Sequence, residues 1–599
     1  MIGMGSIRSK LLEVDLTTEK VSVVDVTEDV QKHLGGRGLG TKLCWDLIPQ
    51  GANPLGPANI LHVGVGPMTS LVGDKTVFSF KSPLTGWKGR STMSGYFARE
   101  IIYAGYNAGI LIRGAADHPV YLYVWNDDVE IRDASHLWGA WKQKSEYGLR
   151  AALRAETGEC FGVASIGPAG ENLVRYANIT TEWIHSGSKW GCGAVMGSKK
   201  LKAIAVRGTQ GPDYADHQRV WELFERYRKH PATAAHKYRE RRFGHMTSMP
   251  TLYHAGWEGV KNNQLGWHEV CLKSNHLEHE MKYHVWTDGC PGCATACFVP
   301  YFKPDGKYGP VSGEMRHDNA GCFNANILVG YEEMAYITPL VEELGMDGEE
   351  VGGIVAWTME LYERGLISKE ELGGIDLQWG SVEATCALLK KIAYREDLGD
   401  VLADGYRFAI PRIGKGCEKY AWQVHGCSCA TYDLRGLPDH ALTYASSHTG
   451  ARMGLGIDSQ ITESATICHF TASPVGAIWG SREECVRQYL NAVCGWDLTL
   501  DDIKMIGLRN FMFERSFSLR EGYRPSRDNK IPERAFDLPI TNKYGDTFLL
   551  DREWFERALK SYYIDALQLS EEGLPTRGLL TKLGLDFVIP VLGPMDVIG

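Results

Sequence analysis

The residues best suited to redox chemistry are three closely spaced cysteines in the middle of the chain. Cys290, Cys293 and Cys297 lie in the stretch DGCPGCATACFVP, residues 288–300, with the spacing C-x2-C-x3-C. This spacing lets three thiolates converge from one loop, which suits a [4Fe–4S] cluster that takes a fourth ligand from elsewhere. Zinc usually takes its ligands as two pairs, and no second pair is evident downstream. The triple therefore predicts a [4Fe–4S] cluster, with zinc and structural thiols as the alternatives.

The fourth ligand cannot be identified from spacing alone, because many cysteines come after the triple. Cys494 in LNAVCGWDLT comes after a helix-like run, and a cysteine in that position by itself reads as a packed thiol. The downstream cysteines that remain open are Cys322, Cys417, Cys427, Cys429, Cys468, Cys485 and Cys494.

Two glycine-rich segments suggest a backbone wrapped around a large ligand. The chain has 68 glycines in 599 residues, above an average usage of about 7%, and glycine permits close backbone approach. Segment 186–200, SGSKWGCGAVMGSKK, combines small residues with Lys189, Lys199 and Lys200, and segment 86–95, GWKGRSTMSG, is comparable. Backbone N–H groups and lysines suit a phosphate. A glycine-rich β-turn with solvated lysines is the alternative for either segment alone.

Composition excludes several classes of function. The formal net charge is −9 and basic residues form no long run, which argues against a nucleic-acid binder that must neutralise phosphates. The 15 cysteines favour metal ligation and buried thiols over a disulfide framework, because a chain of this length can build its own core. Neither an apolar leader nor an 18-residue apolar window is found, so we expect a cytoplasmic protein without direct membrane insertion.

The elements that must position these residues change in character along the chain. Residues 1–208 show β-branched and aromatic alternation with Gly, Asn and Asp turns, which predicts an antiparallel β domain. Helical periodicity begins after residue 209, and a Gly/Cys-rich loop near 423 interrupts it. We therefore expect an α+β fold with three parts: a β-rich domain at 1–208, a helical domain with the cysteine triple at 209–422, and a helical C-terminal domain at 423–599.

Many longer stretches occur in an order that points to one family. They are KSPLTG, YFAREIIYAGYNAGILIRG, IGPAGENLVRYA, GCGAVMGSKKLKAIAVRGT, the cysteine triple, ELGMD, TMELYERGLI, LADGYRFA and YDLRG. In these stretches the chain resembles the aldehyde:ferredoxin oxidoreductase family of tungsten-bis-pterin enzymes, nearly from end to end. The resemblance implies that the β domain forms a base for two pterins and that two helical domains close over the tungsten.

The family holds its pterins with two D-x-x-G-L-(D/C) segments, of which the C-terminal one supplies the last cluster cysteine. Here Glu342-x-x-Gly345-Met346-Asp347 resembles the N-terminal segment, and ESATIC, Glu463 to Cys468, resembles the C-terminal segment. Glutamates replace both leading aspartates, and Thr466 replaces the glycine of the C-terminal segment. The resemblance implies cluster ligation by Cys468 and pterin contacts from Glu342, Gly345, Asp347, Glu463 and Ile467.

Further cofactor contacts are implied by the resemblance and the glycine-rich segments. Lys75 lies where the family carries an arginine between cluster and pterin; an exposed strand lysine is the alternative. The implied cofactors are a tungsten bis-pyranopterin, with molybdenum as the alternative metal, a [4Fe–4S] cluster, and Mg²⁺ bridging the pterin phosphates. The remaining residues predicted to contact the cofactor are Ser91, Met93, Ser94, Gly95, Trp183, Gly187, Lys189, Gly191 and Gly193.

Two residues are predicted to handle protons next to the metal. Glu314 follows Cys297 by 17 residues, close to where the family places a glutamate, and a carboxylate in a dry site can serve as a general base. His448 lies in the segment where the family supplies an active-site histidine, although GARM stands here in place of a GACH-like pattern. A surface carboxylate and a loop histidine are the alternatives.

Other features are similar to the tungsten subunit of class II benzoyl-CoA reductase, a branch of the same family. They are PVYLYVWNDDVEIRDASHL and the C-terminal EEGLPTRGLLTKLGLDFV. That branch implies Cys322 as a tungsten ligand, since a soft thiolate is suitable, and a small buried hydrophobe is the alternative. It also implies an active-site role for the segment LYHAGWEGVKNNQLGWHE, which contains His254 and Glu258.

The preferred function is oxidation of an aldehyde to a carboxylate, with electrons passed through the cluster to ferredoxin or to a ferredoxin-like iron–sulfur subunit. The alternatives are a low-potential tungsten reductase of an aromatic acyl-CoA, a molybdenum bis-pterin oxidoreductase, and an electron-transfer or scaffold subunit without a pterin. The electron partner implies contact with another protein. The chain itself is expected in a homo- or hetero-oligomer. No nucleic acid is expected as a partner.

Overall fold

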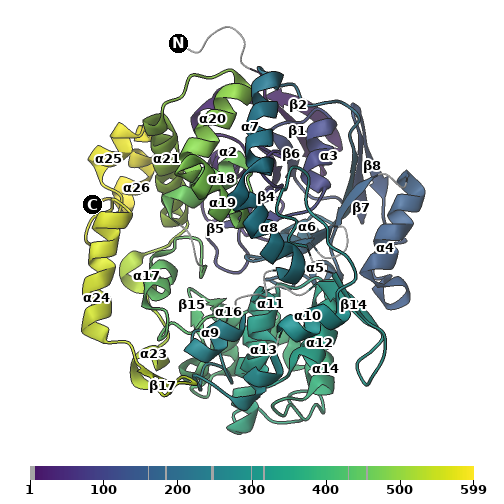
Figure 1. The fold of residues 1–599 in the computed structure, drawn as a ribbon, viewed down its shortest axis with the longest axis vertical. Helices are drawn as coiled ribbons and strands as arrows, with labels where there is room; N and C mark the ends of the chain where they lie inside the picture. The colour runs from purple at the N-terminus through teal and green to yellow at the C-terminus, as the bar shows by residue number, and fades with distance from the viewer. Residues whose placement is uncertain are drawn as a thin grey trace.

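The computed structural model describes residues 7–158, 161–181, 185–244, 249–274, 276–298, 300–314, 317–429, 431–452 and 456–599. Two six-stranded sheets lie in the N-terminal third, and the rest of the chain is mostly helical. In Figure 1 the strands of these two sheets and the first helices lie in the upper half of the molecule, with α9 to α14 below them. The α+β class predicted from the sequence is confirmed.

The first sheet has the strand order β2-β1-β6-β3-β4-β5. Its strands are β1 (Lys10–Asp15), β2 (Lys20–Asp25), β3 (Leu61–Gly64), β4 (Thr76–Lys81), β5 (Lys88–Met93) and β6 (Gly109–Arg113). All six residues of β4 are buried, as expected for a central strand covered on both faces. The helix α2 (Gly36–Leu47) packs against β3 and β4.

The other sheet has the order β11-β10-β9-β12-β7-β8. Its strands are β7 (Val120–Trp125), β8 (Asp128–Asp133), β9 (Gly162–Ser165), β10 (Ile179–Thr181), β11 (His185–Gly187) and β12 (Leu201–Arg207). Each sheet contains one parallel pair, β1 with β6 and β12 with β7. The expectation of a purely antiparallel domain is corrected in this detail. Helices connect these strands, and a parallel pair needs such a crossover.

Long helices come after the sheets and carry most of the remaining core. They are α7 (His217–Lys229), α8 (Pro231–Phe243), α9 (Met249–Ala255), α10 (His276–Tyr283), α12 (Tyr331–Leu344), α13 (Gly348–Glu363), α14 (Val382–Tyr394), α16 (Tyr406–Ile413), α17 (Pro438–Ser446), α18 (Ile457–Ala465), α19 (Ala472–Trp479), α20 (Arg482–Cys494), α21 (Leu500–Arg520) and α24 (Arg552–Ser561). The short α11 spans His317–Cys322, and β14 spans Val311–Glu314.

Two helices show why this part of the sequence is helical. Asp347 caps α13 by accepting the N–H of Glu350, and most residues of the helix are buried, as is typical of a helix in the core of a large protein. Thr499 and Asp502 form a capping box at the start of α21. Both helices lie in the interior, where they support the candidate site.

The C-terminal helices pack against the N-terminal sheet. α18 and α21 contact α2, and α20 contacts α7, so α2 and the green helices α18 and α21 lie next to each other in Figure 1. The chain segments at 36–47 and 457–520 therefore meet across one interface. The boundaries at 208 and 422 stay predictions. Within the described residues, no helix combines the length and apolar character needed to cross a membrane.

Candidate cofactor and active site

The predicted cluster cysteines come from two remote segments that meet on one loop. The backbone N–H of Gly73 donates to the carbonyl of Gly292 at 3.3 Å, and that of Cys468 donates to the carbonyl of Val72 at 3.2 Å. Gly292 has a φ of +67°, and a Cβ there would lie 1.9 Å from the oxygen of Ser70. Glycine is therefore required between the first two cysteines, since only it permits this approach.

The thiols of Cys290, Cys293 and Cys468 lie within electrostatic range of one another. Burial raises the pKa of Cys290 well above its usual value, and the Cys293 and Cys468 sulfurs raise it further. Burial likewise raises the pKa of Cys468, while Lys75 opposes that rise. Metal binding is the usual means by which such thiols deprotonate. Cys297 is half-buried at the end of the same loop.

Polar groups surround these thiols. The N–H of Gly95 donates to Sγ of Cys290 at 3.4 Å, and Nζ of Lys75 donates to Oγ of Ser94 at 2.6 Å. Hydrogen bonds to sulfur and nearby charge are the means by which a protein tunes an iron–sulfur cluster. Lys75 is buried, so the alternative of an exposed strand lysine is excluded.

Within the described residues, no three His, Cys, Asp or Glu side chains converge as closely as the ligands of a single metal ion do. Cys494 ends α20 and is buried, which raises its pKa to about 12; its neighbours Ala492 and Val493 bond to residues 215–216.

The two predicted pterin-binding segments end two helices in the same way. Gly345 follows α12 with a φ of +79°, and Thr466 follows α18 with a φ of +65°, so both are left-handed caps. Glu342 lies three residues before Gly345, and Glu463 lies three residues before Thr466. Glu342 accepts a hydrogen bond from Asn178 at 3.4 Å. Thr466 therefore adopts the backbone conformation that favours the family's glycine.

Glu463 belongs to a buried ionic network. It pairs with Arg90 and, at 3.2 Å, with Nη1 of Arg37. Arg37 also pairs with Glu514, whose Oε2 lies 3.0 Å from Nε2 of His448. Burial would raise the pKa of Glu514, but Arg37 and His448 hold it well below its usual value. The predicted proton-handling residue His448 is thus linked to the C-terminal pterin segment.

Asp347 and Lys189 connect the N-terminal pterin segment to the glycine-rich segment. Asp347 accepts the backbone N–H of Lys189, while Nζ of Lys189 lies 3.0 Å from Oε2 of Glu349 and 3.1 Å from the carbonyl of Ser428. Lys189, Trp190 and Gly191 have consecutive φ values of +66°, +59° and +82°. Left-handed backbone at bulky residues is strained, and such strain gathers at ligand-binding sites.

Buried polar atoms around this loop test whether a pterin fits. In the described part of the chain, Nε of Arg90, Nε1 of Trp190, Oδ1 of Asn178 and Oε1 of Glu350 are buried without a hydrogen-bond partner. Such groups are rare in native proteins and call for a bound partner. The Arg90 guanidinium lies 5.3 Å from the Trp190 ring centre. These donors and acceptors fit the amide-like edges of a pyranopterin.

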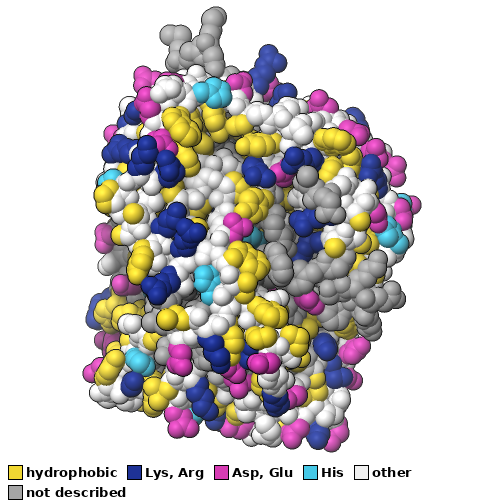
Figure 2. All heavy atoms as spheres, turned by 45° about the vertical axis from the view of Figure 1, so that its right-hand side comes forward, with side chains coloured by type: hydrophobic (Ala, Val, Ile, Leu, Met, Phe, Trp, Pro, Cys, Tyr) yellow, Lys and Arg dark blue, Asp and Glu magenta, His cyan; other side chains and the backbone are white. Residues whose placement is uncertain are grey.

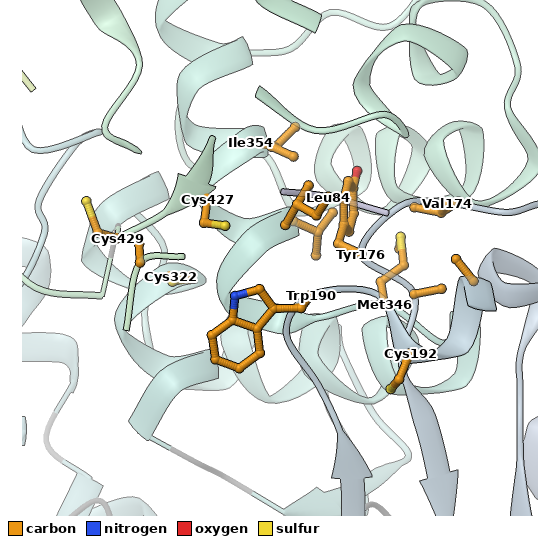
Figure 3. Close-up of a cluster of buried hydrophobic side chains, with 14 of the residues drawn as sticks. Leu84, Val174, Tyr176, Trp190, Cys192, Cys322, Met346, Ile354, Cys427 and Cys429 are labelled. Carbon is orange, nitrogen blue, oxygen red and sulfur yellow. The ribbon is translucent and has the colours of Figure 1, made fainter. Parts of the chain in front are cut away.

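Burial also shifts the pKa values of charged groups at the same place. Burial lowers the pKa of Arg90 to about 9, and Arg37 adds to this. Burial raises the pKa of Glu350 to about 8, against the effect of Lys189. Trp190 and Cys427 lie close together in Figure 3; a Cβ at Gly450 would be 2.6 Å from the Trp190 nitrogen and 2.9 Å from the Cys427 sulfur.

Several predicted contact residues have a packing role in the structure. A Cβ at Gly187 would meet the Phe78 ring, and one at Gly193 would lie 2.1 Å from the oxygen of Asn178. At Gly191 it would lie 2.1 Å from the oxygen of Arg175. Close approach of the chain to itself therefore explains these glycines, and their cofactor contacts stay predictions.

The structure describes most of the other residues that are predicted to contact the cofactor. Oγ of Ser91 donates to the carbonyl of Lys189 at 2.7 Å, and Met93 and Ile467 are buried in the core. Trp183 lies outside the described residues. Lys199 is buried with its Nζ 2.8 Å from the carbonyl of Gly114, so a backbone carbonyl binds its ammonium group.

Glu258 forms a buried acid–base group with a histidine that the sequence patterns do not single out. Oε1 of Glu258 lies 2.8 Å from Nε2 of His317, and the Tyr432 hydroxyl lies 3.4 Å from the other ring nitrogen. Glu258 is fully buried, and its backbone pairs with that of Tyr432. The sequence points to Glu258 only as part of its segment, and no spacing signal relates it to His317.

The predicted catalytic residues Glu314 and His254 have different surroundings. Glu314 ends β14 opposite Pro300, three residues before His317; its side chain lies outside the described part. His254 is half-buried at the end of α9, where Nε2 lies 3.2 Å from Nζ of Lys543. The geometry favours His317 over His254 as the histidine beside Glu258.

Cys322 lies between this acid–base group and the left-handed segment of residues 189–191, which we call the Lys189 loop. Its sulfur is 3.4 Å from the hydroxyl of Thr431 and 3.7 Å from the carbonyl of Glu349, and Glu349 pairs with Lys189. Figure 3 shows its position in the interior with Cys427 and Cys429. Cys322 is therefore buried at the site, and its role as a tungsten ligand stays a prediction.

The fold and the site define an oxidoreductase of the tungsten-pterin class, as comparison with known proteins shows. Residues 11–208 match the model of the aldehyde ferredoxin oxidoreductase N-terminal domain. Residues 220–454 and 458–585 match the model of domains 2 and 3 of the same proteins. The chain belongs to the aldehyde ferredoxin oxidoreductase family.

Relatives from one archaeon illustrate the range of the family. The chain is 33% identical over 576 residues to the tungsten-containing aldehyde ferredoxin oxidoreductase of Pyrococcus furiosus, covering 89% of this chain and 92% of that one. It is 32% identical over 628 residues to the WOR-like subunit of an aliphatic sulfonate oxidoreductase from the same organism, covering 97% of each.

A solved structure agrees in fold. It is the active-site complex BamBC of benzoyl coenzyme A reductase with 1,5-dienoyl-CoA, with a TM-score of 0.79 at 24% identity over 99% of this chain and 100% of that one. At this identity the likeness concerns the fold alone.

Proposed function

We propose that the protein oxidises an aldehyde to a carboxylate and passes the two electrons, one at a time, through a [4Fe–4S] cluster to ferredoxin or a partner iron–sulfur subunit. The observation that carries the proposal is the convergence of Cys290, Cys293 and Cys468 beside Lys75. Cys468 lies two residues beyond Thr466, the left-handed cap of α18. Sequence similarity to tungsten-containing aldehyde ferredoxin oxidoreductases supports the substrate class.

The residues that would hold the pyranopterins are those around the two helix caps and the Lys189 loop. Asn178, Glu342 and Asp347 would serve one pterin, and Arg90 with Glu463 the other. When bound, the tungsten bis-pyranopterin supplies two-electron exchange with the substrate, and Mg²⁺ would join the pterin phosphates. Molybdenum presents nearly the same chemistry to these residues.

The chain's own contribution to the reaction is proton transfer. Oxidation of an aldehyde by water yields a carboxylic acid, two protons and two electrons. Glu258 and His317 share a hydrogen bond of 2.8 Å, and the pair can accept a proton from water or substrate while Tyr432 holds the histidine ring. Glu314, close to His317 in sequence, and His448 remain the predicted proton-handling residues from the family resemblance.

A reductase of an aromatic acyl-CoA is the alternative candidate. The buried sulfur of Cys322 beside Thr431 and Glu349 favours it, because a thiolate there would close a metal position. In that case the acid–base pair would deliver protons to the ring.

Assays of the anaerobically purified holoenzyme separate the two. With aldehydes and an oxidised viologen dye, we expect dye reduction. With an aromatic acyl-CoA and reduced dye, we expect none. Activity with the acyl-CoA and not with aldehydes would overturn the proposal in favour of the acyl-CoA reductase.

A further inference from the structure

Helix α8 is attached to both chain segments that carry the predicted cluster ligands. Nε2 of His236 lies 3.1 Å from the carbonyl of Phe470, two residues beyond Cys468. The hydroxyl of Thr287, which precedes the cysteine triple, donates to the carbonyl of Arg241 at 2.9 Å. α8 also packs against α10 and α19. The outer face of α8 is therefore the protein surface next to the cluster.

That face is basic on a chain that is acidic as a whole. α8 carries Lys237, Arg239, Arg241 and Arg242 against one acid, Glu240, whereas the whole chain has 64 basic and 73 acidic residues. Glu240 is 3% exposed and pairs with Arg239, whose side chain is 59% exposed. Arg241 and Arg242 are exposed as well.

Large hydrophobic side chains are exposed around the same helix. They come from α8, from the end of α10, from the segment before the cysteine triple and from the segment after Cys468: Tyr238 (68%), Met281 (67%), Val285 (52%), Trp286 (39%) and Phe470 (48%). Figure 2 shows a face of the molecule on which hydrophobic and basic side chains lie next to each other. Contiguous exposed apolar groups mark interaction sites.

Phe470 connects this surface to the buried site. Its ring lies 5.9 Å from Nζ of Lys75. Lys75 donates to the hydroxyl of Ser94 at 2.6 Å, and the N–H of the next residue, Gly95, donates to the sulfur of Cys290 at 3.4 Å. One aromatic side chain thus contacts the cation beside the thiols and is 48% exposed at the surface.

We propose that the exposed residues of α8, together with Met281, Val285, Trp286 and Phe470, form the docking surface for an acidic ferredoxin-type iron–sulfur protein. We call them the α8 surface. This inference rests on the proposed function, because it assigns a location to the electron partner. Opposite charge steers two proteins into encounter, and the apolar residues permit the close contact that electron transfer needs.

Charge complementarity selects this partner. A neutral or basic protein would gain nothing from the arginines, and the remainder of a chain whose formal net charge is −9 would repel an acidic carrier elsewhere. Weak electron-transfer complexes have small interfaces, which a patch of this composition can supply. The encounter should weaken with salt, because the screening length falls from about 30 Å at 0.01 M to about 8 Å at 0.15 M ionic strength.

The test uses the holoenzyme and a small acidic two-cluster ferredoxin as the probe. The double variant Arg241→Glu/Arg242→Glu reverses two exposed charges, while the carbonyl of Arg241 that fastens α8 is unaffected. We expect its Kd for the ferredoxin at low ionic strength to rise by about tenfold or more, with a flatter salt dependence. Calorimetric titration measures this without a substrate, so the result is independent of whether aldehydes are oxidised.

The matched control is Arg557→Glu/Lys560→Glu on α24, at the left edge of the molecule in Figure 1, where the Arg557 side chain is 73% exposed. We expect this control to keep the parent Kd, and dye-linked aldehyde activity to stay unchanged in both variants. An unchanged ferredoxin Kd in the α8 variant, or an equal rise in the control, would overturn the docking surface. Absence of dye-linked aldehyde oxidation in the parent protein would instead overturn the proposed function.

Discussion

Glu258 and His317 meet at 2.8 Å in the interior, although they are 59 positions apart in the sequence. Tyr432, a further 115 positions from His317, completes the group on the other ring nitrogen. Three segments thus bring an acid, a base and a hydroxyl together, and Thr431, next to Tyr432 in the sequence, contacts the buried sulfur of Cys322. This arrangement makes Glu258 and His317 the strongest structural candidates for proton transfer.

Replacing Glu258 with Gln keeps the shape and removes the carboxylate. We expect kcat for dye-linked aldehyde oxidation to fall by about 10² to 10⁴-fold, the usual contribution of a positioned acid or base. Tungsten and iron contents should stay at the parent level. The control is Glu363→Gln on the surface of α13, which pairs with Lys261 and should leave kcat unchanged. Parent-level turnover in Glu258→Gln would remove the pair from the mechanism.

Cys468→Ala and Cys494→Ala separate the two candidates for the fourth cluster ligand. Since Cys468 lies with Cys290 and Cys293 and Cys494 lies at the end of α20, only the first change should lower iron content. We expect Cys494→Ala to retain about four iron atoms per chain, as one [4Fe–4S] cluster requires. Iron analysis with the visible absorption of the cluster measures this; full iron in Cys468→Ala would contradict the assignment.

The sequence predicts those parts of the molecule that rest on local signals. The cysteine spacing, the change from alternation to helical periodicity near residue 209, and the two motif segments are all read within short windows. The β domain is recognisable, but its two parallel strand pairs are not, because pairing depends on crossovers that bring remote strands together.

Long-range contacts account for the residues that sequence patterns miss. His317 has no local pattern that distinguishes it from His254, and only the meeting of three segments shows that its ring faces Glu258. The glycines at 187, 191 and 193 show a different ambiguity. Their abundance suggests a ligand, and close packing of the chain also accounts for them. A glycine that approaches a cofactor and one that approaches backbone are indistinguishable in a sequence.

Acid should destabilise the protein partly through His448. Burial lowers its pKa to about 4 from an ordinary 6.5, despite the hydrogen bond to Glu514. The unfolded chain therefore binds a proton that the folded chain does not, so this contribution is present above pH 6.5 and is lost as pH falls toward 4. It amounts to about 3 kcal/mol in full.

Between pH 7 and pH 5, we expect the melting temperature of His448→Gln to fall by less than that of the parent protein. His33, His62 and His425 have similarly lowered pKa values, so part of the acid sensitivity should remain. His118→Gln, at an exposed position, is the matched control and should keep the parent's pH dependence. An equal loss in His448→Gln and the parent would refute the linkage.

Gly345→Ala tests the backbone at the N-terminal pterin segment. A Cβ there would lie 2.9 Å from the nitrogen of Gly167, at a φ of +79°. Gly365 after α13 has a φ of +68° and open space around it, so Gly365→Ala reports the conformational cost alone, about 1 to 2 kcal/mol. We expect a larger fall in melting temperature for Gly345→Ala, with reduced tungsten retention. Equal falls in melting temperature for the two variants would contradict this prediction, because the backbone of Gly167 would then move away from the new Cβ without cost.

The central claim is that an aldehyde gives its electrons to this protein and that they reach the cluster of Cys290, Cys293, Cys297 and Cys468. The direct measurement is electron paramagnetic resonance of the oxidised holoenzyme, frozen after anaerobic addition of an aldehyde without any dye. We predict the signal of a reduced [4Fe–4S] cluster, absent before addition and absent in Cys468→Ala. A parent protein with intact cluster and tungsten that shows no reduced-cluster signal with any aldehyde would contradict the claim.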